Sequence, residues 1–150
     1  MDLIANYSCV TGEGPLWHSD RNLLYWIDIP TGRLFQYDPE TEDHQIVFKG
    51  PQIGGFTIQT DGKLLLFMEK GFIAKWSSEG LETVVEEIRG EEDSRFNDVI
   101  AAPNGSVFCG TMPTKSHSGT LYRLDKDGSL RPVIKNVGIS NGLGFSTNQD

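Results

Sequence analysis

Short apolar runs recur along the chain with a fixed period, and turn residues separate each run from the next. Four segments can be written in register, each reaching Asp or Asn seven residues after its start: 13–20, 54–61, 97–104 and 141–148. Their starts lie 41, 43 and 44 residues apart. Four-stranded propeller blades repeat with a period of roughly 40 to 50 residues. The pattern therefore predicts a repeat of blade length.

Each complete repeat predicts four short strands. The first run is followed by a hairpin turn containing Asp or Asn, and then by β-rich runs separated by further turns. The expected strands after the first of each repeat are 23–29, 32–38 and 44–48, then 63–68, 71–76 and 81–85, then 106–110, 119–125 and 130–134. Helical periodicity is nearly absent, and the one short candidate, 85–89, is interpreted as a turn-like loop. We predict an all-β protein built from four-stranded antiparallel blades.

The chain contains three complete repeats and the expected first strand of a fourth, 141–148. A propeller closes its ring with about four to eight blades, so three and a fraction do not close one. We interpret residues 1–150 as the N-terminal part of a single propeller domain whose remainder is missing. Assembly of two copies is the alternative. An end inside a hairpin turn would leave an unpaired strand edge, which favours the first interpretation.

The net charge and the length of the apolar runs argue against two classes of partner, nucleic acids and membranes. The chain carries 13 Lys and Arg against 21 Asp and Glu, a formal net charge of −8, and it has no basic stripe. We therefore expect no nucleic-acid partner. No apolar run approaches the roughly 18 residues of a membrane span, so we expect no membrane partner. The first residues lack a signal peptide, and two cysteines, Cys9 and Cys109, suit a reducing compartment, so we predict a cytoplasmic location.

The equivalent starting positions of the repeats are Glu13, Gly54, Asn97 and Asn141, and three of them, Glu13, Asn97 and Asn141, are candidate metal ligands. The first strand of each propeller blade lines the central channel, so side chains at these positions converge on one axis. One carboxylate and two amide oxygens form a hard oxygen site that suits Ca²⁺, Mg²⁺ or Mn²⁺, with Zn²⁺ possible but without its preferred ligands. Each residue alone is also typical of a turn. The shared register favours the metal site.

Arg95 lies two residues before Asn97, so on a strand both side chains point to the same side. Its guanidinium is a candidate for binding substrate oxygens. A surface ion pair with Glu91, Glu92 or Asp93 is equally compatible with the spacing. The three histidines share no metal-ligand spacing and are interpreted as solvated or hydrogen-bonded side chains.

Four motifs resemble those of the senescence-marker-protein/gluconolactonase family, also called regucalcin-like. They are Gly12-Glu-Gly-Pro-Leu-Trp17, Arg95-Phe-Asn-Asp98, Gly110-Thr-Met112 and Ile139-Ser-Asn-Gly-Leu143. The resemblance implies a six-bladed propeller, of which this chain looks like the N-terminal half. It also implies hydrolysis of sugar lactones and related cyclic esters with one divalent cation, Ca²⁺ being the first expectation. By analogy Glu13 and Asn141 match metal ligands, Asn97 matches a residue at metal and substrate, and Arg95 matches a substrate-binding arginine.

Two departures from the family pattern matter. The resemblance also implies a third protein ligand of the metal, an Asp that resembles the family's general base and falls beyond residue 150, so no catalytic base is assigned within this sequence. Lys115 falls near the place of a substrate-contacting Glu of some members, and the surrounding 113–119 loop falls where the family has a lid. We expect a metal-dependent, gluconolactonase-like hydrolase acting on a small-molecule lactone. The alternatives are a non-catalytic calcium-binding or interaction propeller, and a family member hydrolysing non-sugar lactones or organophosphate esters; the oligomeric state is open.

Overall fold

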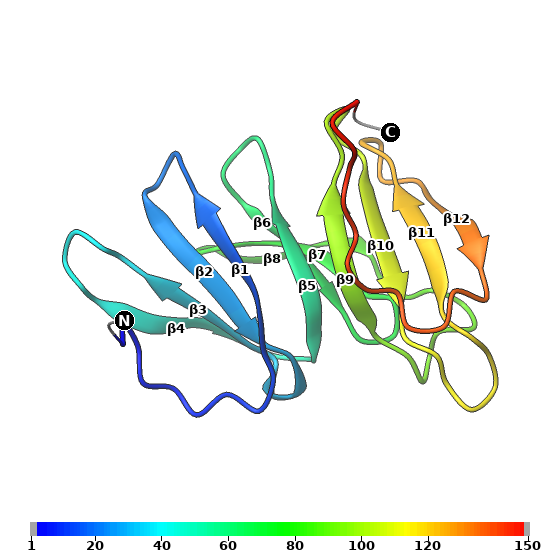
Figure 1. The fold of residues 1–150 in the computed structure, drawn as a ribbon, viewed down its shortest axis with the longest axis horizontal. Coiled ribbons are helices and arrows are strands. Elements are labelled where there is room, and N and C mark those ends of the chain that lie inside the picture. The colour runs from blue at the N-terminus through cyan, green and yellow to red at the C-terminus, as the bar shows by residue number, and fades with distance from the viewer. Residues whose placement is uncertain (1–2, 149–150) are drawn as a thin grey trace.

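A computed structural model describes residues 3–148, which form three four-stranded antiparallel sheets (Figure 1). The first sheet contains β1 (Gly12–His18), β2 (Leu23–Asp28), β3 (Arg33–Tyr37) and β4 (His44–Lys49), with a 3₁₀ turn, η1 (Ile29–Thr31), between β2 and β3. The second contains β5 (Ile53–Ile58), β6 (Leu64–Met68), β7 (Ile73–Ser77) and β8 (Gly80–Val85). The third contains β9 (Phe96–Ala101), β10 (Val107–Thr111), β11 (Thr120–Leu124) and β12 (Leu130–Lys135). The prediction of an all-β fold made of four-stranded antiparallel blades is confirmed.

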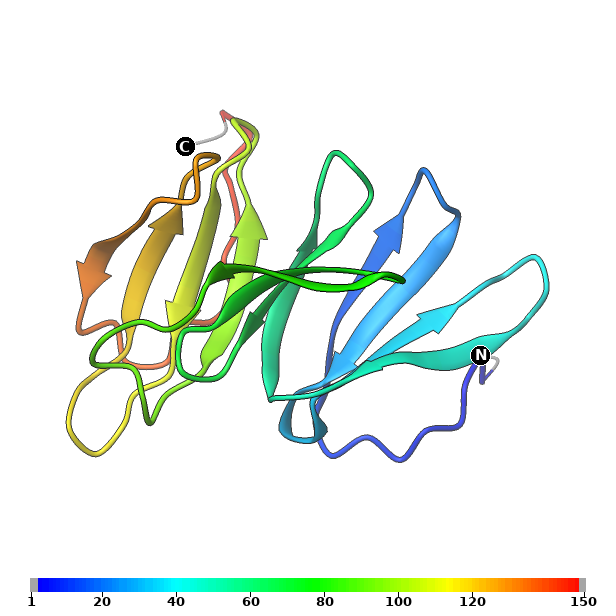
Figure 2. The ribbon, with the colours of Figure 1, turned by 180° about the vertical axis from the view of Figure 1, so that it is seen from behind.

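The three sheets stand side by side like neighbouring blades, with the first strand of each on the inside. Within every sheet the strands follow chain order, so β1, β5 and β9 each form one edge. Figures 1 and 2 show these three strands next to one another, with β5 between β1 and β9. The starting positions of the repeats are thereby brought to one inner face, as the register predicts.

Apolar side chains between neighbouring blades form two core clusters. One joins the first and second sheets around Ile27, Leu34 and Leu66, and the other joins the second and third around Phe67 and Phe96. All five residues of β6 are buried, because the middle blade is covered on both faces. The outer strands β4, β8 and β12 contain mostly exposed and half-buried residues. Burial thus follows position within the stack of blades.

Two expectations about local structure have different outcomes. Residues 85–89 form no helix, as predicted: Val85 ends β8 and a loop follows. The predicted strand at 141–148 is wrong, since this segment forms no ladder within the described residues. A strand needs a main-chain partner, and no described strand pairs with this segment; the side chain of Asp98 accepts the amide of Leu143 (2.7 Å). The segment runs beside β9 without joining a sheet (Figure 1).

Within residues 3–148, no helix has the length and apolar character needed to cross a membrane. Cys9 and Cys109 are both free thiols, and burial raises the pKa of Cys109. The cytoplasmic location and the expected absence of nucleic-acid and membrane partners stay predictions.

Asp28 fixes the corner of the first blade beside the start of β1. Its carboxylate is fully buried and accepts hydrogen bonds from the Thr11 amide (2.8 Å), the Thr31 hydroxyl (2.6 Å) and the Arg33 guanidinium (2.6 Å). Burial alone would raise the pKa of Asp28, but the hydrogen bonds from Thr31, Arg33 and Thr11 outweigh it and lower that pKa. Because Gly12 pairs with Asp28 across the sheet, this network also holds the backbone that precedes Glu13.

Replacing Asp28 with Asn is expected to lower the free energy of unfolding near neutral pH by about 3 kcal/mol, because Arg33 loses its buried anion. The native carboxyl has a lowered pKa, so its contribution is fully present above the unfolded value of about 4 and is lost as the pH falls below it. Urea unfolding at pH 7 and pH 3 should therefore show a difference between wild type and variant that shrinks in acid. Glu82→Gln, which removes an exposed partner of Lys63, should change stability by less than about 1 kcal/mol. Equal losses in the two variants would contradict the assignment.

Candidate functional site

The starts of the innermost strands meet at one end of the blades. Gly14, next to Glu13, faces the ring of Phe56 on β5. A Cβ at Gly54 would overlap the carbonyl of Phe96, so the start of β5 packs directly on the start of β9. The side chain of Asn97 then reaches the segment that contains Asn141. The four positions aligned from the sequence therefore follow one another along the same end of the fold.

Arg95 and Asn97 are hydrogen-bonded to each other. The Arg95 Nη1 group donates to Asn97 Oδ1 (3.0 Å) and to the carbonyl of Phe96 (2.8 Å). Arg95 is half-buried, and burial lowers the pKa of its guanidinium from a high starting value. The ion pairs of the described residues do not include Arg95, so the alternative of a surface ion pair with the nearby acidic residues is not observed. Its spacing to Asn97 brings the two side chains together, as the sequence predicts.

The orientation of the Asn97 amide follows from its partners. Arginine can only donate and a backbone carbonyl can only accept. The Asn97 oxygen must therefore face Arg95, while Nδ2 donates to the carbonyl of Ser140 (2.8 Å). One lone pair of the Asn97 oxygen stays available for a further partner.

The predicted metal ligands are hard oxygen donors at the same end of the fold, but the described residues show no contact that joins all three. Glu13 and Asn141 are exposed, and no hydrogen bond between described residues links Glu13 to Asn97 or Asn141. No group of three or more His, Cys, Asp or Glu side chains among residues 3–148 could hold a metal ion. A carboxylate with two amide oxygens nevertheless has the chemistry that Ca²⁺ and Mg²⁺ prefer. The donor set fits such an ion, and its assignment stays a prediction.

A pocket of about 320 Å³ opens at this end, where β5 and β9 begin. Its lining combines one arginine and one lysine with acidic, neutral polar and apolar side chains: Gln52, Glu69, Lys70, Glu92, Asp93, Ser94, Arg95, Met112 and Pro113. Lys115 is exposed and lies outside this lining, although the 113–119 loop begins at its wall. The structure therefore places Arg95, and not Lys115, in the pocket.

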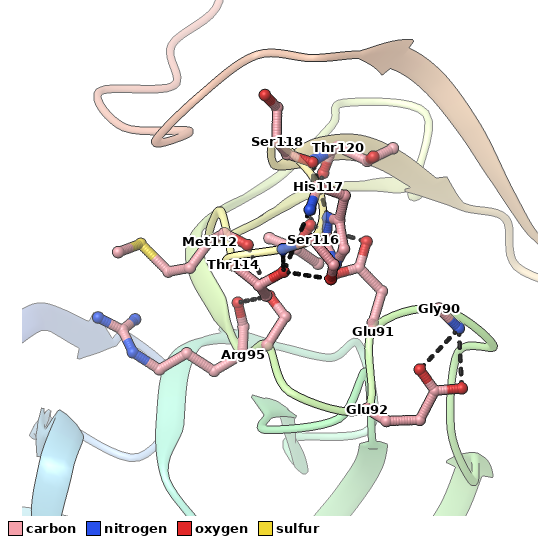
Figure 3. A network of polar contacts seen from close by, with 12 residues as sticks. Gly90, Glu91, Glu92, Arg95, Met112, Thr114, Ser116, His117, Ser118 and Thr120 are labelled. Atoms are coloured by element: carbon pink, nitrogen blue, oxygen red, sulfur yellow. Dashed lines mark hydrogen bonds and ion pairs between the residues drawn. The ribbon is translucent and has the colours of Figure 1, made fainter.

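Backbone contacts hold Arg95 in place. The hydroxyl of Ser94 donates to the carbonyl of Met112 (2.7 Å), and the amide of Met112 donates to the carbonyl of Arg95 (2.8 Å). Figure 3 shows the guanidinium of Arg95 pointing away from the acidic residues Glu91 and Glu92. The conformation of Arg95 thus depends on a strand pairing that continues past the end of β10.

Sequence reasoning missed three supporting residues. Asp98 accepts the amides of Val99 (2.9 Å) and Leu143 (2.7 Å), and so attaches the segment containing Asn141 to β9. Ser140 is buried against Gly110, where a Cβ would overlap its side chain. Gly110 and Ser140 both belong to motifs that the sequence singles out, but neither residue type reveals a partner 30 positions away in the chain.

Each histidine ring has a hydrogen-bond partner, as expected. His18 Nε2 lies 3.2 Å from the carbonyl oxygen of Gly62, and His44 Nδ1 lies 3.0 Å from the hydroxyl oxygen of Tyr7. His117 contacts the backbone of its own loop.

Adjacent four-stranded blades with their first strands on the inside define a β-propeller. Solved propellers share this fold. Regucalcin from Agrobacterium tumefaciens superposes with a TM-score of 0.84 at 21% identity, over 97% of this chain and 50% of that chain. A gluconolactonase from Xanthomonas campestris superposes with a TM-score of 0.78 at 21% identity, over 94% of this chain and 52% of that chain.

The sequence profile of the SMP-30/gluconolactonase/LRE-like region matches residues 11–150, and the chain belongs to this family. It is 46% identical to pentonolactonase XacC of Haloferax volcanii, over 98% of this chain and 50% of that relative. It is 31% identical to a 6-deoxy-6-sulfogluconolactonase of Pseudomonas putida, over 91% of this chain and 48% of the relative. Human regucalcin is 28% identical over 93% of this chain and 49% of its own length. The chain thus spans about half the length of the curated relatives it matches.

Proposed function

We propose that residues 1–150 form the N-terminal part of one six-bladed propeller whose blade repeats begin near residues 13, 54, 97 and 141. Three complete blades and a match to half of each relative support this arrangement. The segment after Asn141 lies beside β9, which supports the proposal that a fourth blade begins there.

We propose that the protein hydrolyses a sugar lactone, with a divalent cation held by Glu13, Asn97 and Asn141. The observation that carries this proposal is the hydrogen-bonded pair of Arg95 and Asn97 beside a pocket in a member of a lactonase-containing family. The identity to a pentonolactonase favours an aldonolactone as substrate. Ca²⁺ is the first expectation for the ion, and Mg²⁺, Mn²⁺ or Zn²⁺ are the alternatives.

Hydrolysis adds water across the ring ester bond and yields an open-chain hydroxy acid. When bound, the cation supplies Lewis-acid polarisation of the ester carbonyl. Arg95 has donors beyond those used by Asn97 and Phe96, and these bind the hydroxyl or carbonyl oxygens of the lactone. Asn97 holds the guanidinium in that orientation, while Met112 and Pro113 form the pocket wall. The proton acceptor for the attacking water is the Asp expected beyond residue 150.

The direct test is titration of the acid released from glucono-1,5-lactone and from pentonolactones by the full-length protein, before and after chelation. Turnover that chelation removes and one added ion restores would support a metal-dependent lactonase and identify its metal. Bound metal without turnover on any lactone would favour the calcium-binding propeller. Turnover restricted to non-sugar lactones or organophosphate esters would change the substrate class.

Replacing Arg95 with Lys is expected to raise KM for the lactone by about tenfold and to lower kcat less. A lysine keeps the positive charge but cannot bridge Asn97 and a substrate oxygen with a rigid fork of donors. Steady-state kinetics measure the two constants separately. Arg123→Lys, which alters an ion pair with Asp125 (2.7 Å), is the matched control and should leave both constants unchanged. An Arg95→Lys enzyme with the wild-type KM would remove Arg95 from the substrate site.

A further inference from the structure

Glu91 is a buried carboxylate in the loop between β8 and β9, and only one of its oxygens is satisfied. Oε1 accepts hydrogen bonds from the hydroxyls of Thr111 (3.1 Å) and Tyr122 (2.9 Å). The side chain is 3% exposed, and Oε2 is buried without a hydrogen-bond partner. An unsatisfied buried carboxylate oxygen is costly. A group that can donate to Glu91 Oε2 should therefore lie close by.

His117 of the 113–119 loop is that neighbour, with its Nε2 atom 3.8 Å from Glu91 Oε2 (Figure 3). Its Nδ1 atom lies 2.8 Å from the carbonyl oxygen of Ser118. A carbonyl only accepts, so Nδ1 carries a hydrogen. In the neutral ring Nε2 is therefore an acceptor with a lone pair. The facing Oε2 atom of an ionised Glu91 is also an acceptor. The two atoms repel unless one proton lies between them.

We propose that Glu91 and His117 share one proton, and that this proton holds the 113–119 loop against the segment that carries Arg95. Both residues are positioning residues for the pocket, acting through the backbone and not on the substrate. Either an imidazolium faces the carboxylate, or a protonated carboxyl faces the neutral ring. In both cases loss of the proton leaves two facing acceptors and releases the loop.

The connection from this pair to the pocket is short. The Thr111 hydroxyl that contacts Glu91 is adjacent to Met112, whose amide donates to the Arg95 carbonyl. The Glu91 carbonyl accepts the amide of Ser94 (2.9 Å), and Ser94 donates to the Met112 carbonyl. Met112 also begins the stretch of chain that leads to His117. Release of the loop would therefore loosen the wall of the pocket formed by Met112.

The other titratable groups around the pair keep one charge state across the neutral range. Burial, with Glu91 beside it, raises the pKa of Tyr122 on β11, and burial raises the pKa of Cys109 on β10, which faces Tyr122. The Gly90 amide lowers the pKa of Glu92, so this carboxylate stays negative near His117, with Arg89 facing it in turn. The shared proton therefore lies between Glu91 and His117 and not on these neighbours.

Amide hydrogen exchange of residues 114–118 in the full-length protein tests the pair directly. The Thr114 amide donates to the His117 carbonyl (2.9 Å) and closes the loop. In wild type, protection relative to unstructured peptide rates should fall about tenfold as the pH rises from 6 to 9, because the attraction between Glu91 and His117 is lost. In Glu91→Gln the side-chain NH2 group faces the Nε2 lone pair of the neutral His117 ring, while the amide oxygen still accepts from Thr111 and Tyr122. Protection should then not fall as the pH rises.

Two further variants complete the test. His44→Gln changes a histidine outside the loop and should follow the wild-type profile. His117→Ala, at a partly exposed residue, should show low protection at every pH, and it keeps the test decisive if Glu91→Gln does not fold. Chelator is present throughout, so that no metal ion replaces the proton. A flat wild-type profile, or the same slope in Glu91→Gln, would overturn the proposal.

The kinetic consequence rests on the proposed function. Lactone KM of wild type should rise with pH relative to Glu91→Gln, while the two kcat values stay parallel. If no lactone is hydrolysed but the exchange profiles differ as expected, the proposed function fails and the shared proton stands. If a lactone is hydrolysed but the exchange profiles of wild type and Glu91→Gln coincide, the proposed function stands and the shared proton is rejected.

Discussion

Replacing Glu13 with Gln is expected to reduce lactone hydrolysis by at least about a hundredfold and to weaken binding of the divalent cation. Glu13 is the one carboxylate among the three ligands proposed within this chain, so the substitution replaces an anionic ligand with a neutral amide. A catalytic cation contributes several kcal/mol of transition-state stabilisation, and each 1.4 kcal/mol is about tenfold in rate. Calorimetric titration with Ca²⁺ and initial rates on the same preparation measure the two effects together.

Glu40→Gln is the matched control for this experiment. Glu40 is an exposed carboxylate in the turn between β3 and β4, and its amide, not its side chain, contacts Asp38. Calcium affinity and turnover should both be unchanged. A Glu13→Gln enzyme with wild-type turnover would remove Glu13 from the site. Lost affinity for the cation with full turnover would separate metal binding from catalysis and favour a structural ion.

The blades can be predicted from the sequence because its turn residues, its strand patterns and its repeat length all agree. Hairpin turns, alternating strands and the repeat length all indicate the same unit, and the strand bounds in the structure differ from the expected ones by at most about three residues. The segment 141–148 fails for a physical reason. A strand depends on a partner as much as on its own composition, and the Asp98 side chain takes the amide of Leu143 that a ladder would use.

The part of the candidate site that depends on spacing along one strand could be predicted from the sequence. Arg95 and Asn97 meet because they lie two residues apart around the start of a strand. Glu91 could not be recognised as a buried carboxylate, because the composition of the acidic stretch 90–93 is typical of a solvated loop. Only folding brings Thr111, Tyr122 and His117 around it, from strands and a loop 20 to 31 residues further along the chain. Long-range polar contacts of this kind leave no local pattern in the sequence.

Gly54 explains why one of the four aligned positions has no oxygen ligand, and it leads to the second large effect. Replacing it with Ala would place a Cβ onto the carbonyl of Phe96, which is backbone and cannot rotate away. β5 and β9 would have to separate, which opens the core around Phe96 as well. We expect the free energy of unfolding to fall by about 3 kcal/mol, at the upper end for overpacked cores.

For a domain of this size such a loss corresponds to a decrease in Tm of roughly 6 to 12 °C, which calorimetry or thermal unfolding followed by circular dichroism measures. Gly12→Ala is the matched control at the start of β1, because its Cβ would meet only the side chain of Cys9, at an ordinary 3.4 Å. There the reduced entropy of the unfolded chain should make the change neutral or slightly stabilising. If both alanine variants kept the wild-type Tm, the inner strands would not be in backbone contact. If Gly54→Ala alone is destabilised, blade packing requires a glycine here, and this requirement excludes a side-chain ligand at this one of the four aligned positions.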